Sequence, residues 1–158
     1  MNATIVNNGA AAIPVTVWMG AQPTDDSLML AVGGSVNFAN DQIGRVDCGV
    51  VRSNLTRMVH SLPAVSAVLV SFIQSALQWY NTLGIGTTSL KVTVTNMDAD
   101  HGIYAVCGSL ADQRVVPVNQ SMAISVRNVS SPVEGKYVLL RPVGFDQFTG
   151  PRGGSIPP

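Results

Sequence analysis

The segment Ile13–Met19, with the sequence IPVTVWM, places an apolar residue at every second position. This two-residue period is typical of a half-buried β-strand. Pro14 has no amide hydrogen to donate, so it favours the start or an edge of a strand. The pair Asn8-Gly9 is a strong turn signal, and it predicts that an earlier short strand, Thr4–Asn7, ends there.

Similar short stretches recur along the chain between clusters of Gly, Pro, Asn and Ser, and each predicts a strand. They are Leu28–Val32, Ser35–Ala39, Val46–Arg52, Leu55–Val59, Leu90–Val94, Ile103–Leu110, Val115–Val118, Met122–Val126 and Tyr137–Leu140. With one helix among them, these strands predict an α+β fold that is mainly β, an antiparallel, sandwich-like body. We expect one β-rich domain over residues 1–143.

One long helix is expected in the middle of the chain, over Leu62–Leu83. Ser61 is a candidate N-cap, Pro63 suits the first turn and Gly84 is a candidate stop. Apolar residues recur at helical spacing and predict the buried stripe. They are Val65, Val68, Leu69, Phe72, Ile73, Ala76, Leu77 and Tyr80.

The opposite face of this predicted helix is polar but carries no charge. Ser71, Gln74, Ser75 and Gln78 lie along it at steps of three and four residues. A helix face in water normally carries Glu and Lys. Hydroxyl and amide groups suit contact with another protein surface, so we expect these four residues to contact a neighbouring subunit. A membrane-spanning helix is disfavoured because the amides would each cost about 1–3 kcal/mol to bury without partners.

The last fifteen residues, 144–158, contain four Gly and three Pro and cannot form a core of their own. We interpret them as an extended arm that is held by a neighbouring subunit. Its apolar residues Phe145, Phe148 and Ile156 are the expected contacts between subunits.

Charge is scarce in this chain. Lys and Arg number nine, Asp and Glu number nine, the net charge is zero, and charged residues make up 11% of the sequence. Soluble domains average about 25%. This composition excludes a disordered chain, a strongly basic nucleic-acid module and a disulfide scaffold. Zero net charge favours association, so the surface is expected either to be covered by other copies of the chain or to be that of a β-protein rich in Ser, Thr, Asn and Gln.

Catalytic and metal-binding patterns are weak. Asp98, Asp100 and His101 could bind a metal or exchange protons, but Asp98–Gly102 also has the composition of a hairpin loop, which we favour. Cys107 with His101 could form a nucleophile–base pair, but Cys107 lies in an apolar strand and is expected in the core. Cys48 and Cys107 could form a disulfide, although buried reduced thiols are favoured. We expect no enzyme activity, no cofactor and no small-molecule substrate.

The basic residues are spread singly along the chain. Arg45, Arg52 and Arg57 fall in one predicted β region and could form a weak contact with RNA or DNA phosphates. An ion pair between Arg45 and Asp47 is the alternative.

Two functions follow as hypotheses from this sequence. The first is a self-assembling structural protein, a viral or phage capsid or coat subunit in a virion or a cytoplasmic assembly. The N-terminus lacks a basic segment followed by an apolar run, so no export signal is expected. The alternative is a β-sandwich binding or membrane-active module of lectin or pore-forming type, but no membrane contact is expected because the helix lacks flanking Lys and Arg.

Overall fold

The computed structural model describes residues 2–19, 22–40, 43–51, 66–83, 88–109, 111–127 and 129–132.

The first strand ends in a turn that is held by a buried asparagine. Strand β1 (Asn2–Asn7) ends where Asn7, which is buried, donates from Nδ2 to the carbonyls of Ala11 (2.9 Å) and Leu30 (3.0 Å). Gly9 is required in the turn because a Cβ there would lie 2.7 Å from the backbone nitrogen of Lys91.

Four strands form an antiparallel sheet in the order β10-β7-β1-β5. Besides β1 they are β5 (Ser35–Ala39), β7 (Lys91–Asn96) and β10 (Ser121–Ser125). Their residues alternate between buried and more exposed positions, as expected for a sheet with one face on the core.

The second sheet has six strands in the order β3-β2-β6-β8-β9, with β4 also paired to β2. They are β2 (Ile13–Met19), β3 (Gln22–Pro23), β4 (Leu28–Leu30), β6 (Ile43–Cys48), β8 (Ile103–Cys107) and β9 (Gln113–Val116). All pairs are antiparallel except β6 and β8, which run parallel with Arg45 opposite Tyr104. Parallel neighbours need a long crossover, and more than fifty residues separate these two strands.

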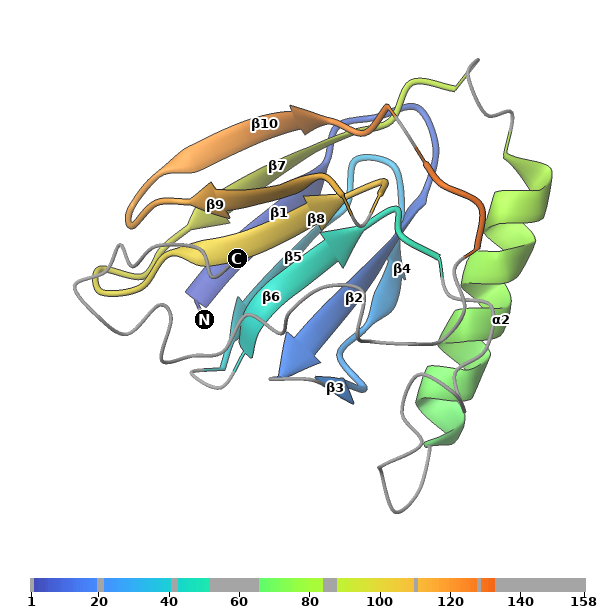
Figure 1. Ribbon diagram of the computed structural model, residues 1–158, viewed down its shortest axis with the longest axis horizontal. Helices are drawn as coiled ribbons and strands as arrows, with labels where there is room; N and C mark the ends of the chain where they lie inside the picture. Colours follow the sequence, from blue (N-terminus) through green and yellow to red (C-terminus); the bar gives the residue numbers. More distant parts are fainter. Residues whose placement is uncertain are drawn as a thin grey trace.

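The two sheets pack face to face with the core between them (Figure 1). Ile5 of β1, Val94 of β7 and Ile124 of β10 meet Val15, Val46 and Ala105 of the other sheet in one apolar cluster. The central strands of the six-stranded sheet, β2, β6 and β8, are buried on both faces, so β2 is not the half-buried strand that its alternation predicts. The sequence-based class, a mainly β α+β sandwich with a long helix, is therefore confirmed for the described part of the chain.

Helix α2 (Ala67–Thr82) stands along the side of the sandwich next to β2 and β4 (Figure 1). Leu69, Phe72 and Ile73 pack on Trp18, while Ala76 and Trp79 join the main core. The Trp79 indole nitrogen donates to the Ala12 carbonyl at 2.6 Å, and this bond holds the C-terminal end of the helix beside the start of β2.

The predicted helix limits need correction. Ser66, not Ser61, is the N-cap of α2, because its Oγ accepts the amide of Leu69 at 3.1 Å. Residues 61–65 lie outside the described residues. The predicted stripe also needs correction: Val68, which it includes, is 53% exposed, whereas Trp79, which it omits, is buried.

Several strands end earlier than predicted, and two of them, β6 and β8, do so for the same reason. β6 stops at Cys48 and β8 at Cys107, and each is followed by a glycine with positive φ, Gly49 (74°) and Gly108 (81°). Only glycine adopts this conformation readily. The two strand ends lie side by side, since the Gly108 amide donates to the Cys48 carbonyl at 2.8 Å. The predicted strands Leu55–Val59 and Tyr137–Leu140 and the arm 144–158 lie outside the described residues.

Candidate assembly surface

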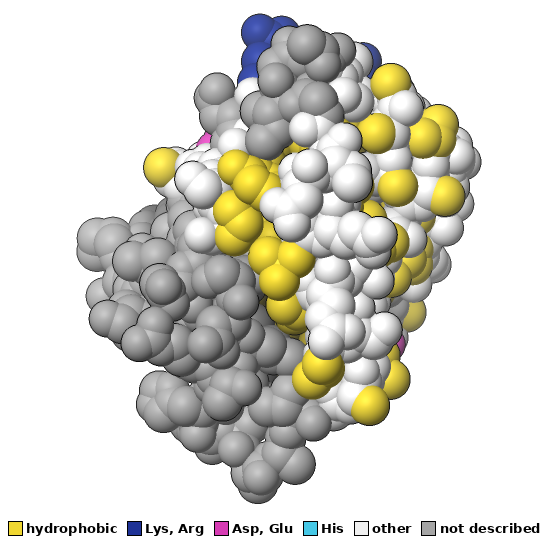
Figure 2. Space-filling model, turned by 90° about the vertical axis from the view of Figure 1, so that its right-hand side faces the viewer, with side chains coloured by type: hydrophobic (Ala, Val, Ile, Leu, Met, Phe, Trp, Pro, Cys, Tyr) yellow, Lys and Arg dark blue, Asp and Glu magenta, His cyan; other side chains and the backbone are white. Residues whose placement is uncertain are grey.

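The outward face of α2 brings together the four helical residues expected to contact a neighbour. Ser71, Gln74, Ser75 and Gln78 are all exposed on this face. No residue of α2 is charged, and its first and last turns contain neither the acidic nor the basic residues that usually occur there. Figure 2 views the molecule from this side: blue atoms are confined to the upper edge and magenta atoms to the margins.

Two apolar side chains extend this uncharged surface toward the start of the helix. Val68 is 53% exposed and Val70 is 40% exposed. Helical spacing predicts Val68 to be part of the buried stripe, and it makes no prediction for Val70. Their exposure follows from the position of the helix, which turns Leu69 and Phe72 rather than Val68 toward Trp18. Such a position is set by packing against the sheet and cannot be derived from helical spacing alone.

The outer face of the four-stranded sheet is a second surface with almost no charge, and the sequence analysis did not predict it. By strand alternation and register, its residues point away from the core. They are Asn2, Thr4, Val6, Ser35, Asn37, Ala39, Lys91, Thr93, Thr95, Ser121, Ala123 and Ser125. Lys91 is the one charged residue of this set. The alternation of Ser, Thr and Ala with apolar residues was visible in each strand, but only the pairing shows that these positions form one surface.

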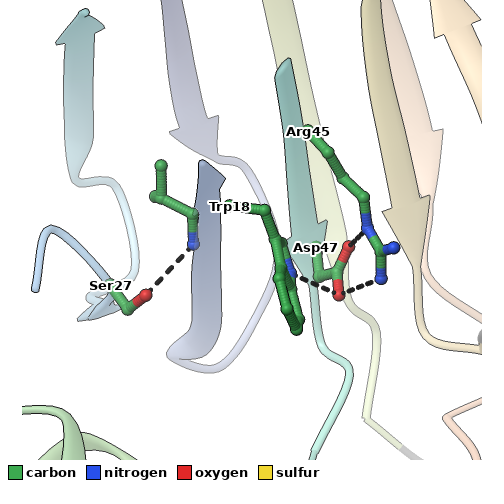
Figure 3. Close-up of polar contacts among 5 residues, drawn as sticks. Trp18, Ser27, Arg45 and Asp47 are labelled. Atoms are coloured by element: carbon green, nitrogen blue, oxygen red, sulfur yellow. Dashed lines mark hydrogen bonds and ion pairs between the residues drawn. The ribbon is translucent and has the colours of Figure 1, made fainter. Parts of the chain in front are cut away.

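Arg45 and Asp47 form a buried ion pair instead of a surface patch (Figure 3). The Arg45 Nε donates to Asp47 Oδ1 at 2.7 Å, and its Nη2 donates to Oδ2 at 2.8 Å. The Trp18 indole nitrogen also donates to Oδ2, at 2.9 Å, and the guanidinium carbon lies 4.8 Å from the centre of the Trp18 ring. All three residues are at most 2% exposed.

This burial bears directly on the expected nucleic-acid contact. A guanidinium that is 2% exposed and held by a carboxylate is not accessible to a phosphate. For Arg45 the structure therefore favours the alternative, the ion pair with Asp47. Arg52 and Arg57 lie outside the described residues.

The Asp98–His101 segment is organised by a buried asparagine. Asn96 donates from Nδ2 to the carbonyls of His101 (2.7 Å) and Val116 (3.0 Å), and its Oδ1 accepts the amide of Asp98 at 2.8 Å. The Asp98 carboxylate accepts the amide of Asn2 at 3.0 Å. Within the described ranges no three His, Cys, Asp or Glu side chains gather as metal ligands would. The loop interpretation accounts for these contacts.

Cys48 and Cys107 are unpaired thiols in the core. They occupy opposite positions of the parallel strands β6 and β8. A hydrogen bond with Cys107 and burial raise the pKa of Cys48 well above its usual value. A reactive cysteine needs a lowered pKa and access to solvent, so Cys48 has the properties of a core residue. Cys107 is buried as well. Burial likewise raises the pKa of Tyr104 to about 12.

An open hollow of about 300 Å³ lies beside the end of β10, where Arg127 is the one charged lining residue among Thr88, Ser89, Leu90, Ser125 and Val126. No described helix combines the length and apolarity that crossing a membrane demands.

Comparisons with protein-family models, curated protein sequences and solved structures gave no match to this chain. Its fold and surfaces are therefore interpreted from its own residues.

Proposed function

We propose that this chain is a self-assembling structural protein, and specifically a viral or phage capsid or coat subunit that acts in a virion or a cytoplasmic assembly. One observation carries the proposal: the two broad outward surfaces, the α2 face and the outer face of the four-stranded sheet, contain a single charged residue, Lys91. Surfaces that stay in water are normally rich in Lys, Glu, Arg and Asp.

The placement of the other charges supports this reading. The charged side chains that reach solvent among the described residues lie mostly in loops and at strand ends: Asp25, Asp26, Lys91, Asp98, Asp100, Asp112, Arg114 and Arg127. Apart from Lys91, they therefore leave the two broad faces uncharged. Obligate contacts between subunits commonly bury more than about 2,000 Å² and resemble a protein core more than a free surface.

The mass of the purified protein in solution tests the proposal. Light scattering at micromolar concentration is expected to give a discrete multiple of 16.6 kDa or a large particle. A stable monomer under these conditions would contradict the proposed function. Co-sedimentation with lipid vesicles by such a monomer would favour the membrane-active alternative instead.

A charge on the helix face tests whether this face is a contact. In the variant Gln74→Glu every copy carries a negative charge there, so we expect assembly to weaken while the fold is kept. The control is Gln113→Glu, the same change at the start of β9 in the other sheet. Equal assembly of both variants and the wild type would remove the helix face from the proposal.

Deletion of residues 144–158 tests the arm that the sequence predicts. We expect the shortened chain to fold, as judged by circular dichroism, but to lose assembly. An unchanged particle would refute the role of the arm.

A further inference from the structure

The two sheets protect their edges differently. In the six-stranded sheet, β9 carries Arg114 and is followed by Pro117, and β3 has two residues, one of them Pro23. β4, which shares the same side of β2, has three residues and lies against α2. Short edge strands, charges, prolines and covering helices are the usual means by which proteins prevent unwanted strand pairing.

Among the residues that the structure describes, the edge strands of the four-stranded sheet have none of these features. β5 (SVNFA) and β10 (SMAIS) each have five residues, and neither contains a charge or a proline. Both have the same burial pattern, in which the first, third and fifth residues are exposed and the fourth is buried. Among the described residues, no strand pairs with their outer sides.

The hydrogen bonds show which backbone groups are available at these edges. The Asn7 amide donates to the Gly34 carbonyl at 2.9 Å, so by antiparallel alternation Val36 and Phe38 bond to β1. The backbone groups of Ser35, Asn37 and Ala39 therefore point outward.

The same argument applies to β10. The Asn96 amide donates to the Gln120 carbonyl at 2.8 Å, and the Val126 amide donates to the Leu90 carbonyl at 2.9 Å. Met122 and Ile124 therefore bond to β7, and the backbone groups of Ser121, Ala123 and Ser125 point outward.

The two edges match each other. β5 and β10 run in opposite directions, because three antiparallel pairings separate them in the sheet. If a second copy follows in the same orientation, its β10 lies antiparallel to β5 of the first. Asn37 then faces Ala123 in a hydrogen-bonded pair, with both side chains on the outer face. The apolar residues of the two strands continue the buried face.

We propose that copies of this chain assemble by pairing β5 of one copy with β10 of the next, which extends the four-stranded sheet across the contact. The partner is a second copy because one head-to-tail contact satisfies both unprotected edges at once. A two-fold pairing of β5 with itself would leave β10 open. Head-to-tail contacts close into rings or continue as open arrays, and either suits the proposed coat function, on which this inference rests.

Proline at an outward-facing amide tests the pairing. Asn37→Pro and Ala123→Pro each remove an amide hydrogen that bonds to no strand within the described residues, so we expect folding to be retained and assembly to be lost. Asn37→Thr and Ala123→Thr keep the amide and serve as controls. Unchanged assembly of folded proline variants would overturn the proposal.

A pair of charges provides the test if proline disturbs the fold. With Asn37→Lys and Ala123→Lys combined, like charges face each other at every contact, and we expect the concentration needed for assembly to rise at least about tenfold. With Asn37→Lys and Ala123→Glu combined, opposite charges meet and assembly is expected to return toward the wild type. Equal behaviour of the two double variants would overturn the pairing.

These experiments separate the two proposals. A wild-type protein that stays monomeric contradicts the coat function. A wild type that assembles, with all edge variants assembling equally well, contradicts the strand pairing alone.

Discussion

At the scale of single residues, the same sequence spacing gives two different ion pairs. Arg45 and Asp47 are two residues apart, as are Asp112 and Arg114, and in both pairs the guanidinium meets the carboxylate. The first pair is at most 2% exposed, whereas the side chains of the second are 39% and 36% exposed. Spacing predicted the Arg45–Asp47 contact as one alternative, but it could not predict the burial, because burial depends on how the segments of the chain pack together.

The difference in burial predicts a difference in stability. Asp47→Asn keeps the shape of the side chain but leaves the buried Arg45 guanidinium without this counter-ion, so the free energy of unfolding is expected to fall by about 3–5 kcal/mol. Asp112→Asn is the matched control and should cost about 1 kcal/mol or less. Urea denaturation of both variants measures the two values. Similar losses for the two would show that burial does not govern the strength of these pairs.

At the scale of elements, the N-cap decides where α2 begins. The hydroxyl of Ser66 accepts the Leu69 amide and donates to the Asp25 carboxylate, which lies in the loop before β4. No acidic residue supports the first turn of α2. Ser66 thus joins the helix to the rest of the fold as well as capping it.

Removal of this cap is expected to destabilise the protein. Ser66→Ala should lower the free energy of unfolding by about 1 kcal/mol, because the Leu69 amide loses its acceptor. Ser71→Ala is the control: it changes an exposed serine in the second turn of α2, where alanine is the better helix former. Thermal unfolding followed by circular dichroism measures both. A Ser66→Ala protein as stable as the Ser71→Ala protein would argue against this N-cap.

Local patterns predicted the existence of the elements better than their limits. The alternation of Ile13–Met19 and the Gly33-Gly34 turn before Ser35–Ala39 identified both strands with the observed bounds, because these signals are local in the sequence. The sequence predicts the helix start at Ser61, but the N-cap is Ser66, whose hydroxyl accepts the Leu69 amide and donates to Asp25. The contact with Asp25 joins residues 41 positions apart, so local patterns could not predict it. The outer face of the four-stranded sheet and its open edges remained hidden because strand pairing is a long-range property.

At the scale of the whole molecule, the distribution of charge matters more than its amount. The composition already showed few charges. The structure adds that one ion pair is buried and that the remaining described charges leave α2 and most of the outer sheet face uncharged. Contacts made by such faces gain their free energy from burial of apolar groups and from hydrogen bonds. Salt screens interactions between charges, so it should weaken these contacts very little.

The salt dependence of assembly follows from this distribution. Between about 0.05 and 1 M NaCl, which shortens the screening length severalfold, we expect the assembled fraction to stay constant, and sodium sulfate should increase it because sulfate strengthens apolar association. Light scattering across the salt series, with a nuclease-treated sample as control, gives the measurement. An assembly held mainly by phosphate contacts would behave differently, because a protein that makes about 6–10 such contacts loses roughly a thousandfold or more in affinity between 50 and 200 mM salt. Dissociation at high salt would therefore show that charged contacts, not the uncharged faces, hold the copies together.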